Sequence, residues 1–338
     1  MPANLTPAYK DAEAAYRQAR DPDERLECLR TMMRTIPKHK GTEHLRAEIK
    51  TKIKELTGEL AGPKQGGARG GPATVIHPEG AGQIALIGPP NSGKSSLHAS
   101  LTGSHTHIGP YPFTTQFPEP GMLVHNDTSI QLIDLPPISP EHPVPWMANA
   151  LQPADGCLLV VDLSHPGCME EVVNLHEMLA TRRILPTGAW DPGMIPSGED
   201  ELDLFTIHLP TLLIVNKVDQ TPNVDAELDV FRELTDCRYP SLTVSATTGE
   251  GLDEIAPWLF RNLRIVRVYT KVPGQQADEG RPFTVREGQT VLDVARLVHR
   301  DIAATLKYAR VWGTDTFAGQ QVGPDHPVAD GDVLELHG

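Results

Sequence analysis

The chain has few cysteines and little positive charge, and each shortage narrows the range of functions. Its four cysteines, Cys28, Cys157, Cys168 and Cys237, show no C-x-x-C spacing, so we expect free thiols in a reducing compartment. Lysine and arginine number 30 against 44 acidic residues, which gives a net charge of −14. Bulk charge therefore does not favour nucleic acid, and any RNA contact must use a local basic patch.

Long hydrophobic runs and aromatic residues are also scarce. No apolar run approaches the roughly 20 residues that span a bilayer. The first twenty residues include Lys10, Asp11, Glu13 and Arg17 and contain no apolar core, so no secretory signal is indicated. Aromatic residues make up only 5% of the chain, whereas glycine (29) and proline (31) are plentiful, which predicts long connections. We expect a cytoplasmic protein of two or three domains, with no membrane contact.

A glycine-rich segment between a strand and a helix is the first motif that carries chemistry. Residues 88–95 read Gly-Pro-Pro-Asn-Ser-Gly-Lys-Ser, after the apolar strand 83–87 and at the start of a helix predicted over 95–101. In such a phosphate loop the glycines let backbone amides turn inward, and the helix N-terminus adds its positive dipole end. Lys94 is expected to reach the β- and γ-phosphates, and the Ser95 hydroxyl to hold Mg²⁺. The nucleotide-binding residues expected here are Gly88, Asn91, Ser92, Gly93, Lys94, Ser95 and Ser96.

A second motif, Asn216-Lys217-Val218-Asp219, directly follows the apolar strand 212–215. Asp219 can accept hydrogen bonds from both N1–H and the exocyclic amine of guanine, a pair that adenine cannot supply, so the motif favours GTP over ATP. Asn216 is expected to bridge toward the base and the phosphate loop, and the Lys217 stem to lie along the ring. Ser245 and Ala246, at the end of a predicted strand, are expected to offer backbone N–H groups to guanine O6.

Two segments between these motifs lie where GTPases have their switch elements. Residues 111–115, Tyr-Pro-Phe-Thr-Thr, supply a hydroxyl for the Mg²⁺ shell, and a strand ends at Asp134, which is expected to bind Mg²⁺ through water. The chain then continues Leu-Pro-Pro-Ile, so that Pro137 stands where GTPases normally carry the glycine of Asp-x-x-Gly. Proline has neither the N–H nor the backbone freedom of that glycine. Ile138 lies where Ras-like proteins place a water-orienting Gln. We therefore predict slow hydrolysis, unless another backbone N–H substitutes.

With these motifs in order, the sequence resembles the Obg-like branch of translation-factor-type GTPases, in particular the developmentally regulated GTP-binding proteins. The resemblance covers about residues 40–338. It rests on Tyr-Pro-Phe-Thr-Thr at 111–115, Asp-Leu-Pro at 134–136, Gly-Thr-Glu-His-Leu at 41–45, Tyr-Thr-Lys at 269–271 and Tyr-Ala-Arg-Val-Trp-Gly at 308–313. It implies a C-terminal TGS domain, a ubiquitin-like β-grasp module. It also implies that Thr115 is the switch Mg²⁺ ligand and, with Lys94, part of the catalytic set. The family's ribosomal-protein-like insert after the Asp134 region is missing.

Asn91 departs from that family, whose members more often have Ser there. GTPases that use potassium as an activating ion carry Asn three residues before the phosphate-loop lysine, and Asn91-Ser92-Gly93-Lys94 looks like that pattern. An amide oxygen at this point could help to hold K⁺ between the α- and γ-phosphates. The alternative is that Asn91 only forms hydrogen bonds within its loop.

Four segments are expected along the chain. Residues 1–61 read as a helical region, 62–82 as a glycine- and proline-rich linker, 83–263 as a P-loop GTPase domain with a doubly wound, mostly parallel α/β sheet, and 264–338 as the TGS domain. Within the GTPase domain, residues 181–209 are predicted to be a surface loop insertion. The lysine-rich helix over 46–60 forms either a solvated face, which we favour, or an RNA-binding arm. Tyr308 and Trp312 are read as core residues rather than as RNA-stacking residues.

The function that these features favour is a Mg²⁺-dependent GTPase that works as a nucleotide-controlled switch. GTP and GDP are the expected ligands, and a ribosome or RNA, contacted through the TGS domain and the N-terminal helices, is the expected partner; DNA is not expected. Two alternatives stay open. One is a nucleotide-gated binding module with little or no hydrolysis, and the other is an ATPase of the Obg-like type, against which the intact guanine motif counts.

Overall fold

The computed structural model describes residues 5–19, 21–61, 76–104, 117–138, 146–194, 204–272, 274–275, 277, 280–314 and 316–338. Contacts divide the chain into two compact units. The first takes in 1–78, 83–121 and 132–249, and the second takes in 79–82, 122–131 and 250–338. The expected switch segment 111–115, with Thr115, lies outside the described residues.

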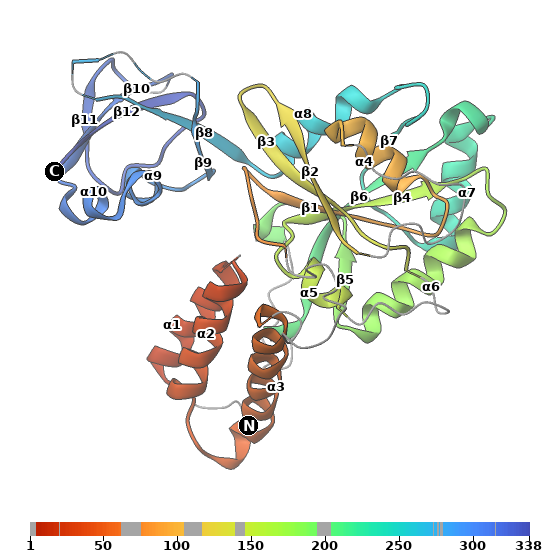
Figure 1. Ribbon diagram of the computed structural model, residues 1–338, viewed down its shortest axis with the longest axis horizontal. Coiled ribbons are helices and arrows are strands. Elements are labelled where there is room, and N and C mark those ends of the chain that lie inside the picture. Colours follow the sequence, from red (N-terminus) through yellow and green to blue (C-terminus); the bar gives the residue numbers. More distant parts are fainter. Residues whose placement is uncertain are drawn as a thin grey trace, which may run out of the picture. The chain divides into compact units, whose positions relative to one another are not determined.

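Three helices begin the first unit (Figure 1): α1 (Pro7–Gln18), α2 (Pro22–Thr35) and, after a short 3-10 turn η1 (Lys40–Thr42), α3 (Glu43–Leu60). The side chains of Thr6 and Asp21 cap the first two helices by accepting hydrogen bonds from backbone N–H groups of the first turn. A proline follows each cap, where its missing N–H costs nothing. The apolar stripe of α3 packs with the other two helices in one core, which includes Tyr9, Tyr16, Leu29, Met32, Ile36, Leu45 and Ile49.

A seven-stranded sheet carries the nucleotide motifs. Its strand order is β2-β3-β1-β4-β6-β5, and β7 also pairs with β6. The pairs β1–β4, β4–β6, β5–β6 and β6–β7 are parallel. The strands are β1 (Gln83–Ile87), β2 (Glu119–His125), β3 (Thr128–Asp134), β4 (Gly156–Asp162), β5 (Ile184–Thr187), β6 (Ile207–Asn216) and β7 (Ser241–Thr243). The helices between them are α4 (Lys94–Thr102), α5 (Met147–Leu151), α6 (Cys168–Thr181) and α7 (Val224–Thr235), with short 3-10 turns η2 (Pro192–Met194) and η4 (Val218–Gln220).

The prediction of a surface loop over 181–209 is wrong for much of its length. Its first part forms β5, which pairs with the start of β6. Trp190 is 9% exposed, and its indole N–H donates to the Thr211 carbonyl. Phe205 belongs to the core of the N-terminal helices and meets Tyr16 edge to face, with ring centroids 6.1 Å apart. The prolines and glycines of this segment suggested a loop. In the structure the segment instead links the N-terminal helices, through Phe205, to the sheet, through β5. Residues 195–203 lie outside the described part.

The second unit contains a β-grasp fold, as predicted. Its five-stranded sheet has the order β11-β10-β12-β8-β9, with β12 and β8 parallel and the other three neighbouring pairs antiparallel. A capping box between Thr290 and Asp293 begins α9. The elements are α8 (Leu252–Asn262), β8 (Ile265–Thr270), β9 (Phe283–Arg286), α9 (Val291–Val298), α10 (Arg300–Thr305), β10 (Tyr308–Trp312), β11 (Gln320–Val322) and β12 (Asp332–His337).

Tyr308 and Trp312 are not in the core of this unit, contrary to our expectation. The core takes Ala309 and Val311, so the alternate residues of β10 face the other side of the sheet. There Tyr308 stacks on His337 with centroids 4.6 Å apart. The Lys271 ammonium lies 3.5 Å from the centre of a Trp312 ring. Both aromatic rings are thus held by neighbours within the same sheet.

An ionic network joins the β2–β3 turn to the β-grasp sheet inside the second unit. The Arg267 guanidinium donates to Asp127, 3.0 Å away, and to Asp330, 2.8 Å away, and the Tyr269 hydroxyl also donates to Asp127. Burial alone would raise the pKa of Asp127, but the hydrogen bonds from Tyr269 and Arg267 outweigh it and lower that pKa.

The described residues include all four cysteines of the chain. All four cysteines are free thiols, and burial raises the pKa of Cys157 to about 12. Among the described residues, no helix combines the length and the apolar character that crossing a membrane requires.

Candidate nucleotide-binding site

The phosphate loop connects β1 to α4, and two of its backbone positions accept only glycine without strain. Gly88 has φ +150°, and a Cβ there would lie 2.3 Å from the Val160 carbonyl oxygen. Gly93, which precedes α4, has φ +91°, and a Cβ there would lie 2.2 Å from the Asn216 side-chain nitrogen. The conformation that turns the loop toward a ligand therefore depends on close packing against β4 and β6.

Lys94 is folded into this loop. Its ammonium donates to the carbonyl oxygens of Gly88, at 3.0 Å, and Pro89, at 2.7 Å. Burial lowers the pKa of Lys94 to about 8, although the nearby carboxylates of Asp134 and Glu171 act in the opposite direction. A phosphate group at this position would raise that pKa again, because it offers negative charge directly to the amine.

Two expected Mg²⁺ ligands lie in contact. The Ser95 hydroxyl, in the first turn of α4, donates to a carboxylate oxygen of Asp134 at 2.6 Å. Asp134 ends β3 and is fully buried. A hydroxyl and a carboxylate oxygen side by side are hard oxygen ligands of the kind that Mg²⁺ takes beside nucleotide phosphates. These residues fit the ion; Thr115, the third expected ligand, lies outside the described residues.

The Asn216 side chain joins three segments that are far apart in sequence. Asn216 ends β6 and is 1% exposed. Its amide nitrogen donates to the Ser92 carbonyl of the phosphate loop at 3.0 Å, and its amide oxygen accepts from the Ala246 N–H at 3.1 Å. The structure therefore brings the phosphate loop, the end of β6 and the segment after β7 together at one edge of the sheet.

Asp219 and Lys217 are positioned by neighbours in the same region. The Ser245 hydroxyl donates to Asp219 at 2.6 Å and fixes an otherwise exposed carboxylate. The Lys217 ammonium donates to the backbone carbonyl of Asn91 at 2.8 Å. The lysine stem therefore runs from the guanine motif at 216–219 to the phosphate loop. Ser96 follows in the first turn of α4.

Asp162 is a residue of this site that the sequence analysis missed. It ends β4, opposite Asn216 in the strand register, and accepts a hydrogen bond from the Lys217 ammonium at 2.7 Å. Burial would raise the pKa of Asp162, but the bonds from Lys217 and Ser164 outweigh it and lower that pKa. The signal available in the sequence was a carboxylate at the end of a fully buried strand, the same signal that identified Asp134.

The segment after Asp134 is packed into the core. Residues 135–138 are all buried, and Leu135 and Ile138 belong to the apolar cluster that also contains Met147 and Leu151. The Leu135 N–H is bonded to the Leu86 carbonyl. Ile138 therefore turns its side chain into the core and not toward a nucleotide.

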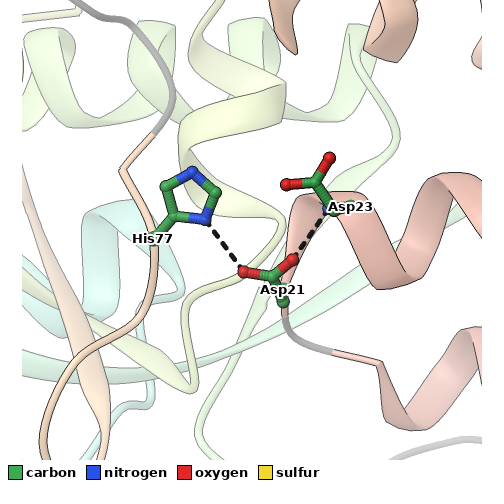
Figure 2. A group of neighbouring side chains, drawn as sticks. All are labelled: Asp21, Asp23 and His77. Carbon is green, nitrogen blue, oxygen red and sulfur yellow. Dashed lines mark hydrogen bonds and ion pairs between the residues drawn. The ribbon is translucent and has the colours of Figure 1, made fainter.

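A separate group of acidic and imidazole side chains could hold a metal ion, but its contacts indicate a structural role. Figure 2 shows that the Asp21 carboxylate is bonded to the His77 ring, 2.8 Å away, and to the Asp23 backbone N–H. Asp21 is the cap of α2, so its carboxylate already has helix and imidazole partners. We assign this group to fastening the segment at His77 to the start of α2.

Comparisons with known proteins agree with this geometry. The family model described as 50S ribosome-binding GTPase matches residues 83–186, and the TGS domain model matches residues 266–337. Developmentally-regulated G-protein 1 of Arabidopsis thaliana is 28% identical over 93% of this chain and 90% of its own length. An uncharacterised GTP-binding protein of Methanocaldococcus jannaschii is 26% identical over 93% of this chain and 92% of its own length.

Solved structures show the same fold. A GTP-binding protein from Pyrococcus horikoshii has a TM-score of 0.51 at 15% identity and covers 75% of this chain and 99% of its own. The YchF GTPase of Schizosaccharomyces pombe has a TM-score of 0.50 at 11% identity and covers 77% and 99%. The resemblance to Obg-like GTPases with a C-terminal TGS domain, and to the developmentally regulated G-proteins in particular, is confirmed.

Replacing Gly93 by Ala should disrupt the site through Asn216. The new Cβ would displace the Asn216 amide, which costs about 1–3 kcal/mol beyond the roughly 1 kcal/mol for a non-glycine residue at positive φ. The midpoint temperature of thermal unfolding and the affinity for GDP should therefore both fall. Gly288→Ala is the matched control, because Gly288 has φ +87° with nothing within 4 Å of its Cβ position. Equal destabilisation by both changes would mean that the Asn216 contact does not constrain the site.

Proposed function

We propose that this chain is a Mg²⁺-dependent GTP-binding protein that hydrolyses GTP to GDP and phosphate slowly, and that it acts as a nucleotide-controlled switch in the cytoplasm. Membership of the GTP-binding GTPases is supported by the family match and by the named relatives. The observation that carries the proposal is the Asn216 bridge, because its two hydrogen bonds link the phosphate-binding and base-binding motifs into one site.

The residues of the site have separable tasks in this proposal. Lys94 and the loop amides bind the β- and γ-phosphates, and Asp219, positioned by Ser245, selects guanine. Ser95 and Asp134, with Thr115, hold Mg²⁺, which neutralises charge on the phosphates when it is bound. Asp162 is proposed to position Lys217, whose stem covers the base.

A second candidate function, a nucleotide-gated binding module with little turnover, is favoured by one observation. The buried segment 135–138 offers neither a side chain at Ile138 to orient water nor an N–H at Pro137 for the γ-phosphate. Affinities for GTP, GDP and ATP, followed by single-turnover hydrolysis, separate the switch from the module and from an ATPase.

Ribosomes or RNA are the partners we propose, contacted through the TGS domain and the N-terminal helices; no membrane and no DNA are included. The segment boundaries at 61, 82 and 263 are proposed as the limits of the functional parts. Co-sedimentation with ribosomes in GDP and in a non-hydrolysable GTP analogue tests the partner directly. Equal co-sedimentation in both nucleotides would contradict a switch.

Asp219→Asn should weaken GTP binding. Removing a charged acceptor from the guanine N1–H and amine costs about 3 kcal/mol, which is a loss of roughly a hundredfold in affinity. Calorimetric titration of GTP and ATP measures it, and Asp225→Asn on the exposed start of α7 controls for the charge change. Wild-type protein that binds ATP as tightly as GTP would contradict the guanine assignment.

Pro137→Gly should raise the rate of hydrolysis, the preference for GTP over GDP, or both, because it supplies an N–H and backbone freedom together. Pro137→Ala supplies the N–H alone and so separates the two effects. Single-turnover hydrolysis and the two nucleotide affinities are measured for each variant. If neither variant differs from the wild type in either property, another backbone N–H already fills this role.

Potassium should stimulate hydrolysis if Asn91 contributes to a monovalent-cation site. Asn91 is exposed, has φ +59°, and its side chain makes no hydrogen bond within the described part of the chain, which leaves its amide oxygen available. Rates in K⁺ and Na⁺ are compared at matched ionic strength. The variant is Asn91→Ala, and its control is Asn223→Ala, because Asn223 is also exposed with φ +56°. Equal rates in the two salts, or stimulation that survives Asn91→Ala, would contradict this role.

A further inference from the structure

Helix α3 has two polar flanks beside its buried apolar stripe, and on one of them the charges are paired. His44, Glu48 and Lys52 line a cavity of about 350 Å³ together with Arg182 and Arg183. The Glu48 carboxylate lies 3.0 Å from the Arg183 guanidinium, and Lys52 lies 3.3 Å from Glu55. This flank is an internal contact between the helical region and the end of α6.

The other flank carries Arg46, Lys50 and Lys54 at successive intervals of four residues, which places them in one row along the helix. None of the three forms an ion pair within the described residues, and the Nε atom of Arg46 is buried there without a hydrogen-bond partner. Glu43, in the first turn, is the acidic residue on this side. Like charges at four-residue spacing destabilise a helix by a few tenths of a kcal/mol per pair, so helix stability does not explain the row.

The region of the row is basic, although the chain as a whole is acidic. Residues 38–54 contain six lysines and arginines against two glutamates, in a protein of net charge −14. At a rise of about 1.5 Å per residue, the row extends over roughly 12 Å. A local basic strip of this kind is the form of positive charge that an acidic protein can still present to a polyanion.

The surroundings of the row indicate what kind of polyanion it fits. Protein partners need apolar or aromatic anchors at the centre of an interface, and none of the exposed large apolar side chains of the described chain lies on α3. A membrane-surface helix needs a free apolar face, whereas Leu45 and Ile49 are packed in the helical core. Evenly spaced cations without apolar anchors match a phosphate backbone.

We propose that Arg46, Lys50 and Lys54 form a binding surface for the phosphate backbone of RNA. The choice of RNA rests on the proposed function in translation; the surface itself rests on the geometry of α3. Contacts of this type position the protein on RNA and do not read its sequence. The sequence left two interpretations of the lysine-rich helix, a solvated face and an RNA-binding arm. The unpaired row favours the RNA-binding arm.

The test uses the full chain and a fluorescein-labelled single-stranded RNA of mixed sequence, with anisotropy measured across a range of KCl concentrations. The triple variant Arg46→Gln, Lys50→Gln, Lys54→Gln should bind at least tenfold more weakly. The slope of log Kd against log[KCl] should become shallower by about 2, because each phosphate contact on a single strand contributes about 0.7 to it. The matched control is Arg238→Gln, Arg261→Gln, Arg264→Gln, which removes the same charge from exposed positions outside the N-terminal helices and the TGS domain.

Several outcomes overturn the proposal. They are an unchanged affinity in the row variant, an equal loss in the control variant, or wild-type binding to vesicles of anionic lipid but not to RNA. The charge-conserving variant Lys50→Arg, Lys54→Arg should keep wild-type affinity, and its failure to do so would also count against backbone binding. GTP affinity is measured in every variant. If the row variant binds both GTP and RNA with wild-type affinity, this proposal alone is overturned. If the wild-type protein does not bind GTP, the proposed function is overturned.

Discussion

The nucleotide site depends on one buried amide. Asn216 uses both ends of its side chain, and each bond ends on the backbone of another segment, so the phosphate loop and the loop after β7 cannot move independently. A buried amide that lost either partner would leave a polar group unsatisfied at a cost of about 1–3 kcal/mol. Gly93 is the complementary requirement, since any larger residue would occupy the space of the Asn216 nitrogen.

Around that amide the site combines two kinds of support. Charged groups near the carboxyl ends of strands are held by polar partners. Asp134, at the end of β3, accepts a hydrogen bond from Ser95 of α4, and Lys217, just after β6, donates to Asp162 at the end of β4. The apolar segment 135–138 is held by packing instead. Where a flexible GTPase switch would begin, this protein has a buried, proline-rich connection. One departure from the usual GTPase pattern lies in these residues after Asp134, and the other is Asn91 in the phosphate loop.

Much of the fold could be predicted from the sequence because local patterns carried it. Strand β1 follows from its apolar run, and the helix starts at Thr6, Asp21 and Thr290 follow from their capping residues, whereas the β-grasp domain was expected from the family resemblance. The errors concern contacts between distant segments. Nothing local shows that Phe205 joins the core of α1 to α3, or that the exposed face of β10 holds Tyr308 against His337. Asp162 did carry a local signal, a carboxylate at the end of a buried strand, but its partner Lys217 becomes its neighbour only when β4 pairs with β6.

The consecutive prolines after Asp134 also determine how this region can be observed. Pro136 and Pro137 have no amide proton, so within residues 135–138 amide hydrogen exchange and amide-detected NMR can follow only Ile138 and Leu135, whose N–H is bonded to the Leu86 carbonyl. Methyl groups are the better reporters. Leu135 and Ile138 are both in the core beside Met147, and their methyl resonances will register any rearrangement that the backbone signals miss.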